Sequence, residues 1–230
     1  MWANSYSDLD GDLDLIENPT PRCACMLVLD VSSSMHGDPI NELNQGVNQF
    51  IEEVCQDDFA SSAVELGVIT FGTIVNEVIP VQSILQVNTP IFTASGATAM
   101  GSAILKAIEV LEKRTQAYKD NGVAHYKPWI VLMTDGKPTD DHVYREAAAT
   151  LRQLAENNKI LVFGIGIGNS CNIEKLAQAC PADRPPKTLT GYRFRDFFKW
   201  LSASMAQVSV STPGTGVELP PTTGWDSIQA

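Results

Sequence analysis

Histidine, cysteine and positively charged residues are scarce in this chain of 230 residues. There are three histidines in no spaced cluster and an odd number of cysteines without C-x-x-C spacing, so neither a zinc ribbon nor a complete disulfide framework is predicted. Lys and Arg number 16 against 27 Asp and Glu, and no basic run or helical stripe is present. A chain with a formal net charge of −11 would repel a phosphate backbone, which excludes nucleic acid as an expected partner.

Long hydrophobic runs are also missing. No stretch approaches the roughly 18 apolar residues of a membrane span, and the first residues lack the basic and apolar regions of a secretory signal. We therefore expect a cytoplasmic protein with no membrane partner. Hydrophobic residues still make up 44% of the chain, which is enough for a buried core, and the length suits one domain. We predict an acidic tail over residues 1–20, a domain over 21–210 and a Pro-, Gly- and Thr-rich tail over 211–230.

Hydrophobic periodicity predicts alternating strands and helices within the domain. An apolar run over residues 23–29 stops abruptly at Asp30 and is followed by a helical pattern from Pro39, with Asp38 as its predicted cap. Two β segments, 64–71 and 74–80, are separated by Gly72-Thr73, which fits a tight hairpin. Further strands are expected at 129–134, 159–167 and 187–190, and further helices at 99–119, 143–154, 173–179 and 194–208. This order predicts an α/β fold with a doubly wound, mostly parallel sheet, one antiparallel edge strand and helices on both faces.

Three polar loops should leave this sheet at the carboxyl ends of its strands, where ligands bind in doubly wound folds. The first follows the first strand and holds Asp30, Ser32 and Ser34, which alternation in an extended loop would point to one side. The second carries Thr98 before a long helix, and the third carries Asp135 after the strand that ends in Met133-Thr134. These five side chains form one candidate site.

The candidate site contains only oxygen ligands. Carboxylates and hydroxyls without His or Cys suit hard cations, so Mg²⁺ is the expected ion, with Mn²⁺ or Ca²⁺ as alternatives. Five protein oxygens leave about one octahedral position open. Because only two of the five side chains carry charge, the bound ion would remain electrophilic toward an incoming carboxylate.

The run Asp30-Val31-Ser32-Ser33-Ser34 resembles the D-x-S-x-S motif of the metal-ion-dependent adhesion site (MIDAS) in the von Willebrand factor A superfamily. Thr98 and Asp135 stand at its other two ligand positions, while Ser33 replaces a residue that is often Gly and Ala97 one that is commonly Gly or Thr. The resemblance implies a Rossmann-like fold and a module without catalysis that binds an Asp or Glu of a protein partner through the cation.

A narrower resemblance concerns four short segments of the domain. They are similar to the bacterial TerY-like group associated with tellurite resistance and stress response, and comprise Gly37-Asp38-Pro39-Ile40, Leu43-Asn44-Gln45-Gly46, Ile69-Thr70-Phe71 and Leu132-Met133-Thr134-Asp135-Gly136-Lys137-Pro138-Thr139-Asp140-Asp141. That similarity implies an associated kinase or phosphatase as the partner.

Two other functions remain open at this point. A haloacid dehalogenase-like phosphohydrolase also places an Asp at a strand end beside Mg²⁺, but it needs a second acid two residues later, where this chain has Ser32. A structural interaction protein whose site no longer depends on metal is the third possibility. Serine hydrolase chemistry is disfavoured because G-x-S-x-G is absent.

Overall fold

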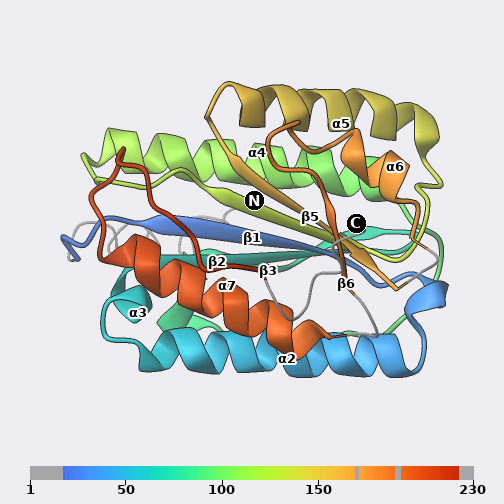
Figure 1. Cartoon of the computed structure of the whole chain (residues 1–230), viewed down its shortest axis with the longest axis horizontal. Helices are drawn as coiled ribbons and strands as arrows, with labels where there is room; N and C mark the ends of the chain where they lie inside the picture. The colour runs from blue at the N-terminus through green and yellow to red at the C-terminus, as the bar shows by residue number, and fades with distance from the viewer. Residues whose placement is uncertain (1–17, 169–170, 190–192, 223–230) are drawn as a thin grey trace, which may run out of the picture.

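A six-stranded sheet forms the centre of the computed structural model, which describes residues 18–168, 171–189 and 193–222 (Figure 1). The strands are β1 (Cys23–Asp30), β2 (Val64–Phe71), β3 (Val75–Ser83), β4 (Trp129–Thr134), β5 (Leu161–Ile167) and β6 (Lys187–Leu189). Their order is β3-β2-β1-β4-β5-β6, and all neighbours are parallel except the antiparallel pair β2 and β3. The predicted sheet, including its antiparallel edge strand, is confirmed.

The strand order reverses between β1 and β4. From β1 the chain moves outward to β2 and β3, and from β4 it moves outward in the other direction to β5 and β6. In the parallel pairing Leu29 lies opposite Met133, so the next residues, Asp30 and Thr134, end their strands side by side. The crevice beyond these two strand ends is the place where doubly wound sheets bind ligands.

Helices cover both faces of the sheet, as the sequence predicts (Figure 1). Helices α2 (Asp38–Gln56) and α7 (Phe194–Ser209) lie on one face together with the short α3 (Ala60–Ala63). The other face carries α4 (Met100–Asp120), α5 (Asp141–Glu156) and the short α6 (Ile173–Ala177). Strands β1, β2 and β4 are buried along their whole length, because each contributes side chains to the hydrophobic cluster on either face.

Several local details differ from the sequence-based expectation. Gly37, with φ of 90°, is the residue that precedes the first turn of α2, so the prediction that Asp38 caps this helix is wrong. Asp38 instead lies in the first turn, where its negative charge is favourable to the helix dipole. The connection between β2 and β3 has three residues, 72–74, instead of two. The short α3 and two 3₁₀ turns, η1 (Ser33–Met35) and η2 (Ile84–Gln86), were not expected.

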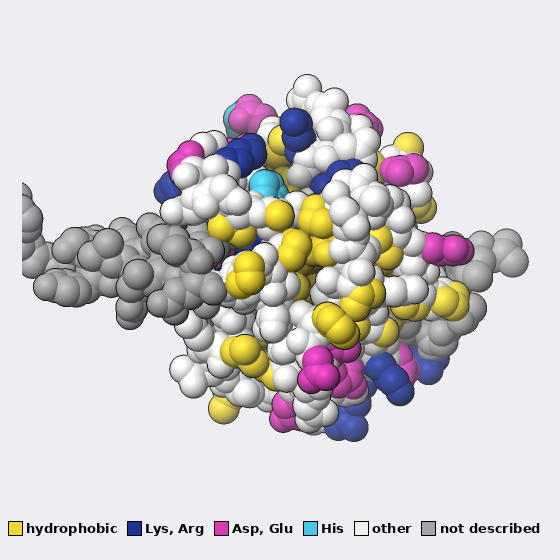
Figure 2. Space-filling model, turned by 90° about the vertical axis from the view of Figure 1, so that its left-hand side faces the viewer, with side chains coloured by type: hydrophobic (Ala, Val, Ile, Leu, Met, Phe, Trp, Pro, Cys, Tyr) yellow, Lys and Arg dark blue, Asp and Glu magenta, His cyan; other side chains and the backbone are white. Residues whose placement is uncertain are grey.

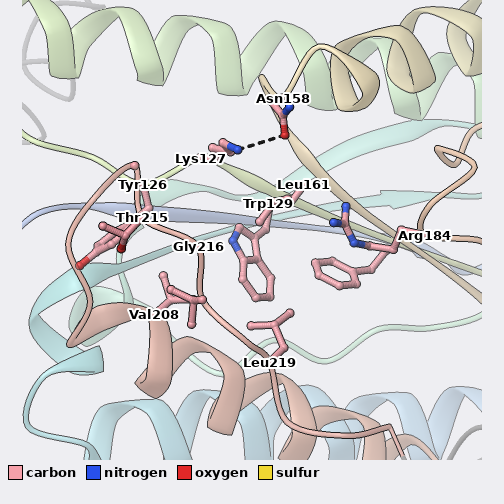
Figure 3. A pocket seen from close by; sticks show the side chains of 13 residues that line it. Tyr126, Lys127, Trp129, Asn158, Leu161, Arg184, Val208, Thr215, Gly216 and Leu219 are labelled. Atoms are coloured by element: carbon pink, nitrogen blue, oxygen red, sulfur yellow. Dashed lines mark hydrogen bonds between the residues drawn. The ribbon is translucent and has the colours of Figure 1, made fainter.

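The segment after α7, which the sequence assigns to a tail, lies against the domain over residues 211–222. Tyr126 donates its hydroxyl to the Ser211 carbonyl at 2.6 Å, and the indole N–H of Trp200 donates to the Pro220 carbonyl at 2.7 Å. This segment, α7 and the beginnings of β4 and β5 enclose a cavity of about 280 Å³, into which the Trp129 ring projects (Figure 3). Trp225 lies outside the described residues.

The two ends of the sheet differ in what they present to solvent. Figure 2 looks onto the end where the parallel strands begin, and hydrophobic side chains gather near the centre of that view with charged ones mainly around them. The polar loops after β1 and β4 lie at the other end, on the right of Figure 1. Within the described part of the chain, no helix combines the length and apolar character that a membrane crossing needs.

Candidate metal centre

The loop after β1 brings Asp30, Ser32 and Ser34 together by turning back on itself. The Ser32 N–H donates to Asp30 Oδ1 at 2.8 Å, and the hydroxyls of Ser32 and Ser34 lie 3.0 Å apart. Ser34 lies within the 3₁₀ turn η1, whose buried Met35 anchors the loop in the core. The convergence of the three side chains is as predicted, but its cause is a tight turn and not the alternation of an extended chain.

The loop after β4 meets the first loop. Ser34 donates its hydroxyl to Asp135 Oδ1 at 2.7 Å, which joins two residues 101 positions apart in the sequence. Thr134, at the end of β4, donates its hydroxyl to Asp30 Oδ2 at 2.6 Å and accepts the Gly136 N–H at 3.2 Å. Four of the five predicted residues are thus connected, directly or through one another.

Thr98, the fifth predicted residue, lies beside this group. A side chain placed at Gly136 would come within 3.8 Å of the Thr98 hydroxyl, so that hydroxyl is adjacent to the Asp135 loop. Thr98 is held through its backbone, because its N–H donates to Thr139 Oγ1 at 3.1 Å and its carbonyl accepts the Thr139 N–H at 2.9 Å. Among the described residues its hydroxyl makes no hydrogen bond to the other four side chains.

Two residues that support the site were not singled out from the sequence. Thr134 orients Asp30, and Asp140 accepts the N–H groups of Gly101 and Ser102 at 3.1 and 2.9 Å at the start of α4. Asp140 thereby fixes the first turn of α4 immediately after Thr98. No local sequence signal points to Thr134, because its contact with Asp30 depends on the register between β1 and β4.

The electrostatics of the site are those of two carboxylates without a basic partner. Burial raises the pKa of Asp30, hydrogen bonds from Ser32 and Thr134 oppose the shift, and the charge of Asp135 adds to it. Burial also raises the pKa of Asp135, against the hydrogen bond from Ser34. Among the described residues no Lys, Arg or His nitrogen forms an ion pair with either carboxylate.

The oxygen atoms of the site lie close to one another. The hydroxyls of Ser32 and Ser34 are 3.0 Å apart, and the Ser34 hydroxyl is 2.7 Å from Asp135 Oδ1. Among the described residues no group of three or more His, Cys, Asp or Glu side chains is placed to hold a metal ion, so a cation held here would depend on hydroxyl ligands.

Comparison with known proteins identifies the family. Residues 25–202 match the model of the von Willebrand factor type A domain. The inter-alpha-trypsin inhibitor heavy chain H3 of Bos taurus is 26% identical over 162 residues, which cover 67% of this chain and 17% of that protein. Heavy chain H1 of Bos taurus is 20% identical over 159 residues, covering 66% of this chain and again 17% of that protein.

Solved structures share the fold at lower identity. Proximal thread matrix protein 1 from the mussel byssus superposes with a TM-score of 0.57 at 20% identity, covering 82% of this chain and 49% of that one. A second structure of the mussel protein, described as having a zinc occupied MIDAS motif, has a TM-score of 0.52 at 20% identity over 91% of this chain and 52% of that one. The pilus adhesin SpaC from Lactobacillus rhamnosus GG gives 0.64 at 13% identity, over 82% and 31% of the two chains. With 178 of its 230 residues within the family model, this chain belongs to the von Willebrand factor type A domain family, whose members are typically metal-dependent protein-interaction modules.

Proposed function

We propose that this chain binds a divalent cation through Asp30, Ser32, Ser34, Thr98 and Asp135 and uses the ion to bind an acidic residue of a partner protein. The observation that carries the proposal is the pair Asp30 and Asp135. Two carboxylates with raised pKa values lie among neutral hydroxyls, with no basic side chain of the described residues paired to them. Buried negative charge without a partner is costly, and a bound cation would remove that cost.

Magnesium is the ion that we propose. The oxygen-only ligand set suits Mg²⁺, whereas zinc favours nitrogen and sulfur ligands in a tetrahedron. Manganese and calcium remain the alternatives, since both accept oxygen ligands. The zinc in the MIDAS motif of the mussel protein makes zinc a necessary comparison in any titration.

The partner is proposed to supply an Asp or Glu carboxylate to the open coordination position. Three of the five proposed ligands are neutral hydroxyls. The two carboxylates therefore do no more than neutralise the double positive charge of the ion, which can still attract another carboxylate. A net charge of −11 opposes an acidic partner at long range, but salt screens such repulsion beyond about 8 Å. Direct coordination to the ion is not screened in this way.

The proposal also extends to the cellular role of the protein. The similarity of residues 132–141 to the TerY-like group supports a role in a stress response of the tellurite-resistance kind, with an associated kinase or phosphatase as the partner. We also propose a cytoplasmic location. We propose an adaptor without catalysis of its own, because the position two residues after Asp30 holds Ser32 and not the second acid that phosphoryl transfer of the dehalogenase type requires.

The test is a pull-down with the full chain in Mg²⁺ and in chelator, together with calorimetric titration of Mg²⁺, Mn²⁺, Ca²⁺ and Zn²⁺. We expect a protein partner that is retained in Mg²⁺ and lost in chelator. Asp30→Ala should lose both the ion and the partner, while Asp196→Ala, which removes an exposed carboxylate paired to Arg193, should retain both. Partner retention in chelator would instead support an interaction protein that does not depend on metal. Magnesium-dependent hydrolysis of p-nitrophenyl phosphate, lost in Asp30→Ala, would support the phosphohydrolase.

A further inference from the structure

A hollow of about 330 Å³ lies beside the proposed cation site, at the end of the β2–β3 hairpin. Its lining comes from the loop after β1, the end of β2, strand β3 and the loop that leads to Thr98. Val31, between the proposed ligands Asp30 and Ser32, forms part of its wall. The hollow and the ion therefore share one loop.

The rim of the hollow is unusually apolar for a solvent-facing surface. Seven large hydrophobic side chains of the described residues are exposed, and three of them, Ile74, Val78 and Ile91, line this one hollow. Ile91 is 84% exposed and Ile74 is 69% exposed. Isolated apolar side chains on a surface need no explanation, but several around one concavity indicate a binding surface.

The exposure of Ile91 is imposed by the fold. Asn44, on α2, donates its side-chain N–H to the Phe92 carbonyl at 2.9 Å and accepts the Phe92 N–H at 2.7 Å. These two bonds fix the backbone of Phe92, whose ring is buried in the core, while the neighbouring Ile91 faces solvent. A loop held in this way presents Ile91 before any partner arrives, so binding would lose little additional conformational freedom.

Backbone hydrogen bonds connect the hollow rigidly to the proposed cation site. The Ser95 N–H donates to the Val31 carbonyl at 2.7 Å, and the Ala99 N–H donates to the Gly72 carbonyl at 3.0 Å. The approach is close, because a side chain at Gly72 would come within 2.5 Å of the Ser95 carbonyl oxygen. A ligand that binds the ion and enters the hollow would meet one preformed surface.

The lining of the hollow is uncharged, so it does not repel an acidic partner. Its lining residues include no Asp, Glu, Lys or Arg among those that the structure describes, although the whole chain carries a net charge of −11. A peptide with a carboxylate on the ion would therefore meet no close negative charge as it continues into the hollow. Polar side chains such as Thr73 and Asn76 leave hydrogen bonds available to its backbone.

We propose that the partner is recognised at two adjoining points: its Asp or Glu binds the cation, and an aliphatic or aromatic side chain close in its sequence fills the hollow between Ile74, Val78 and Ile91. This inference rests on the proposed function, because the ion fixes the acidic residue. The hollow adds selectivity, since an acidic segment without the apolar neighbour would gain only the coordination bond.

The experiment uses the full chain and a phage-displayed library of linear peptides with one fixed Asp between randomised positions. Selection is carried out in Mg²⁺, and bound phage are released by chelator. We expect the released peptides to be enriched in Leu, Ile, Val or Phe at a constant distance from the Asp. Ile91→Ser and Ile74→Ser should each weaken these peptides about ten-fold, the loss expected when the burial of one aliphatic side chain is partly removed.

Leu85→Ser is the matched control, because Leu85 is 61% exposed but lies outside the hollow. It should leave peptide affinity unchanged. All three substitutions are at exposed positions, and an unchanged melting temperature and an unchanged Mg²⁺ affinity would show that fold and ion site are intact.

Each other outcome overturns the inference in a distinguishable way. Peptides that need Mg²⁺ but show no apolar preference and no loss with Ile91→Ser would reject the hollow and leave the proposed function in place. Apolar peptides that stay bound in chelator would show that the hollow acts apart from the ion. A complete lack of Mg²⁺-dependent peptides would reject both proposals.

Discussion

Asp30 and Glu65 are buried carboxylates on adjacent strands of one sheet, and they lie at its opposite ends. Both are at most 1% exposed. Glu65 accepts two hydrogen bonds from Arg114, at 2.6 and 2.7 Å, and one from the Tyr118 hydroxyl, and Arg22 lies 3.5 Å away. Asp30 accepts hydrogen bonds from the Ser32 N–H and the Thr134 hydroxyl, and no basic side chain of the described residues forms an ion pair with it.

The two carboxylates differ in whether a basic side chain of the described residues compensates their charge. At the start of the sheet, Arg22 and Arg114 compensate the charge of the buried Glu65 carboxylate. At the other end the chain provides two acids and several hydroxyls but no paired cation among the described residues. This difference supports the proposal that the second end of the sheet binds a cation from solution.

Glu65→Gln should have the largest effect on folding. The substitution leaves the buried Arg22 and the partly buried Arg114 without their carboxylate, and breaking a buried ion pair in this way typically costs about 3–5 kcal/mol. Urea unfolding should show this loss equally with and without Mg²⁺. A loss that appeared only in the absence of Mg²⁺ would mean that the two ends of the sheet are coupled.

Asp30→Asn should have little effect on folding but a large effect on Mg²⁺ affinity. Without Mg²⁺ the free energy of unfolding should change by no more than about 1 kcal/mol, the size of one hydrogen bond, because a buried charge is removed along with it. Calorimetry should show Mg²⁺ affinity reduced more than about 100-fold, since even residues that only orient metal ligands cost 10–100-fold. Wild-type affinity in this variant would contradict the assignment of Asp30.

The dependence of stability on pH should differ between the protein with bound Mg²⁺ and the protein without it. Because burial raises the pKa values of Asp30 and Asp135, their contribution to stability is greatest when they are protonated and is lost as the pH rises through the raised values. Bound Mg²⁺ reverses this loss by favouring the ionised forms.

We therefore expect Mg²⁺ at 100 times its dissociation constant to add about 2.7 kcal/mol at neutral pH. The increment should shrink as the pH falls through the raised pKa values, because protons then compete with the ion. Thermal unfolding across pH measures the effect, and Asp30→Asn is the control without an increment. An increment that stayed constant into the acid range would argue that the ion binds elsewhere.

Thr134→Val tests whether orientation of Asp30 matters apart from its charge. The substitution keeps the shape of the side chain but removes the hydroxyl that donates to Asp30 Oδ2 at 2.6 Å. Loss of such a supporting bond should weaken Mg²⁺ about 10–100-fold by calorimetry. Thr150→Val, which removes a hydroxyl bonded only within α5, should leave the affinity unchanged.

Much of the fold was predictable because its elements have clear periodicity. The apolar run of β1 and the helical patterns of α2 and α4 gave their positions to within one or two residues. Gly37 was missed as the start of α2 because a positive φ depends on how the loop folds, and the neighbouring Asp38 is by composition the better cap. The contacts of residues 211–222 are made by isolated side chains such as Val217 and Leu219, which leave no period to detect.

In the candidate site, too, local sequence patterns were predictable and contacts between distant segments were not. Its five residue types were identified from the ends of predicted strands, and the structure brings Asp30, Ser32, Ser34 and Asp135 into one hydrogen-bonded group. Thr134 was overlooked because the register between β1 and β4 is set by contacts far apart in the sequence. Metal ligation by the five residues remains a prediction.

Thr98→Ala should have the smallest effect, about ten-fold or less on Mg²⁺ affinity, because the lost ligand is a neutral hydroxyl that water can replace. The loop itself should persist, since Thr98 is held to Thr139 by its own backbone N–H and carbonyl, which alanine retains. Thr98→Ser is the matched variant that restores the hydroxyl and should bind Mg²⁺ like the wild type. A loss as large as that of Asp30→Asn would give the hydroxyl an importance equal to that of a charged ligand, whereas no loss in either variant would remove Thr98 from the site.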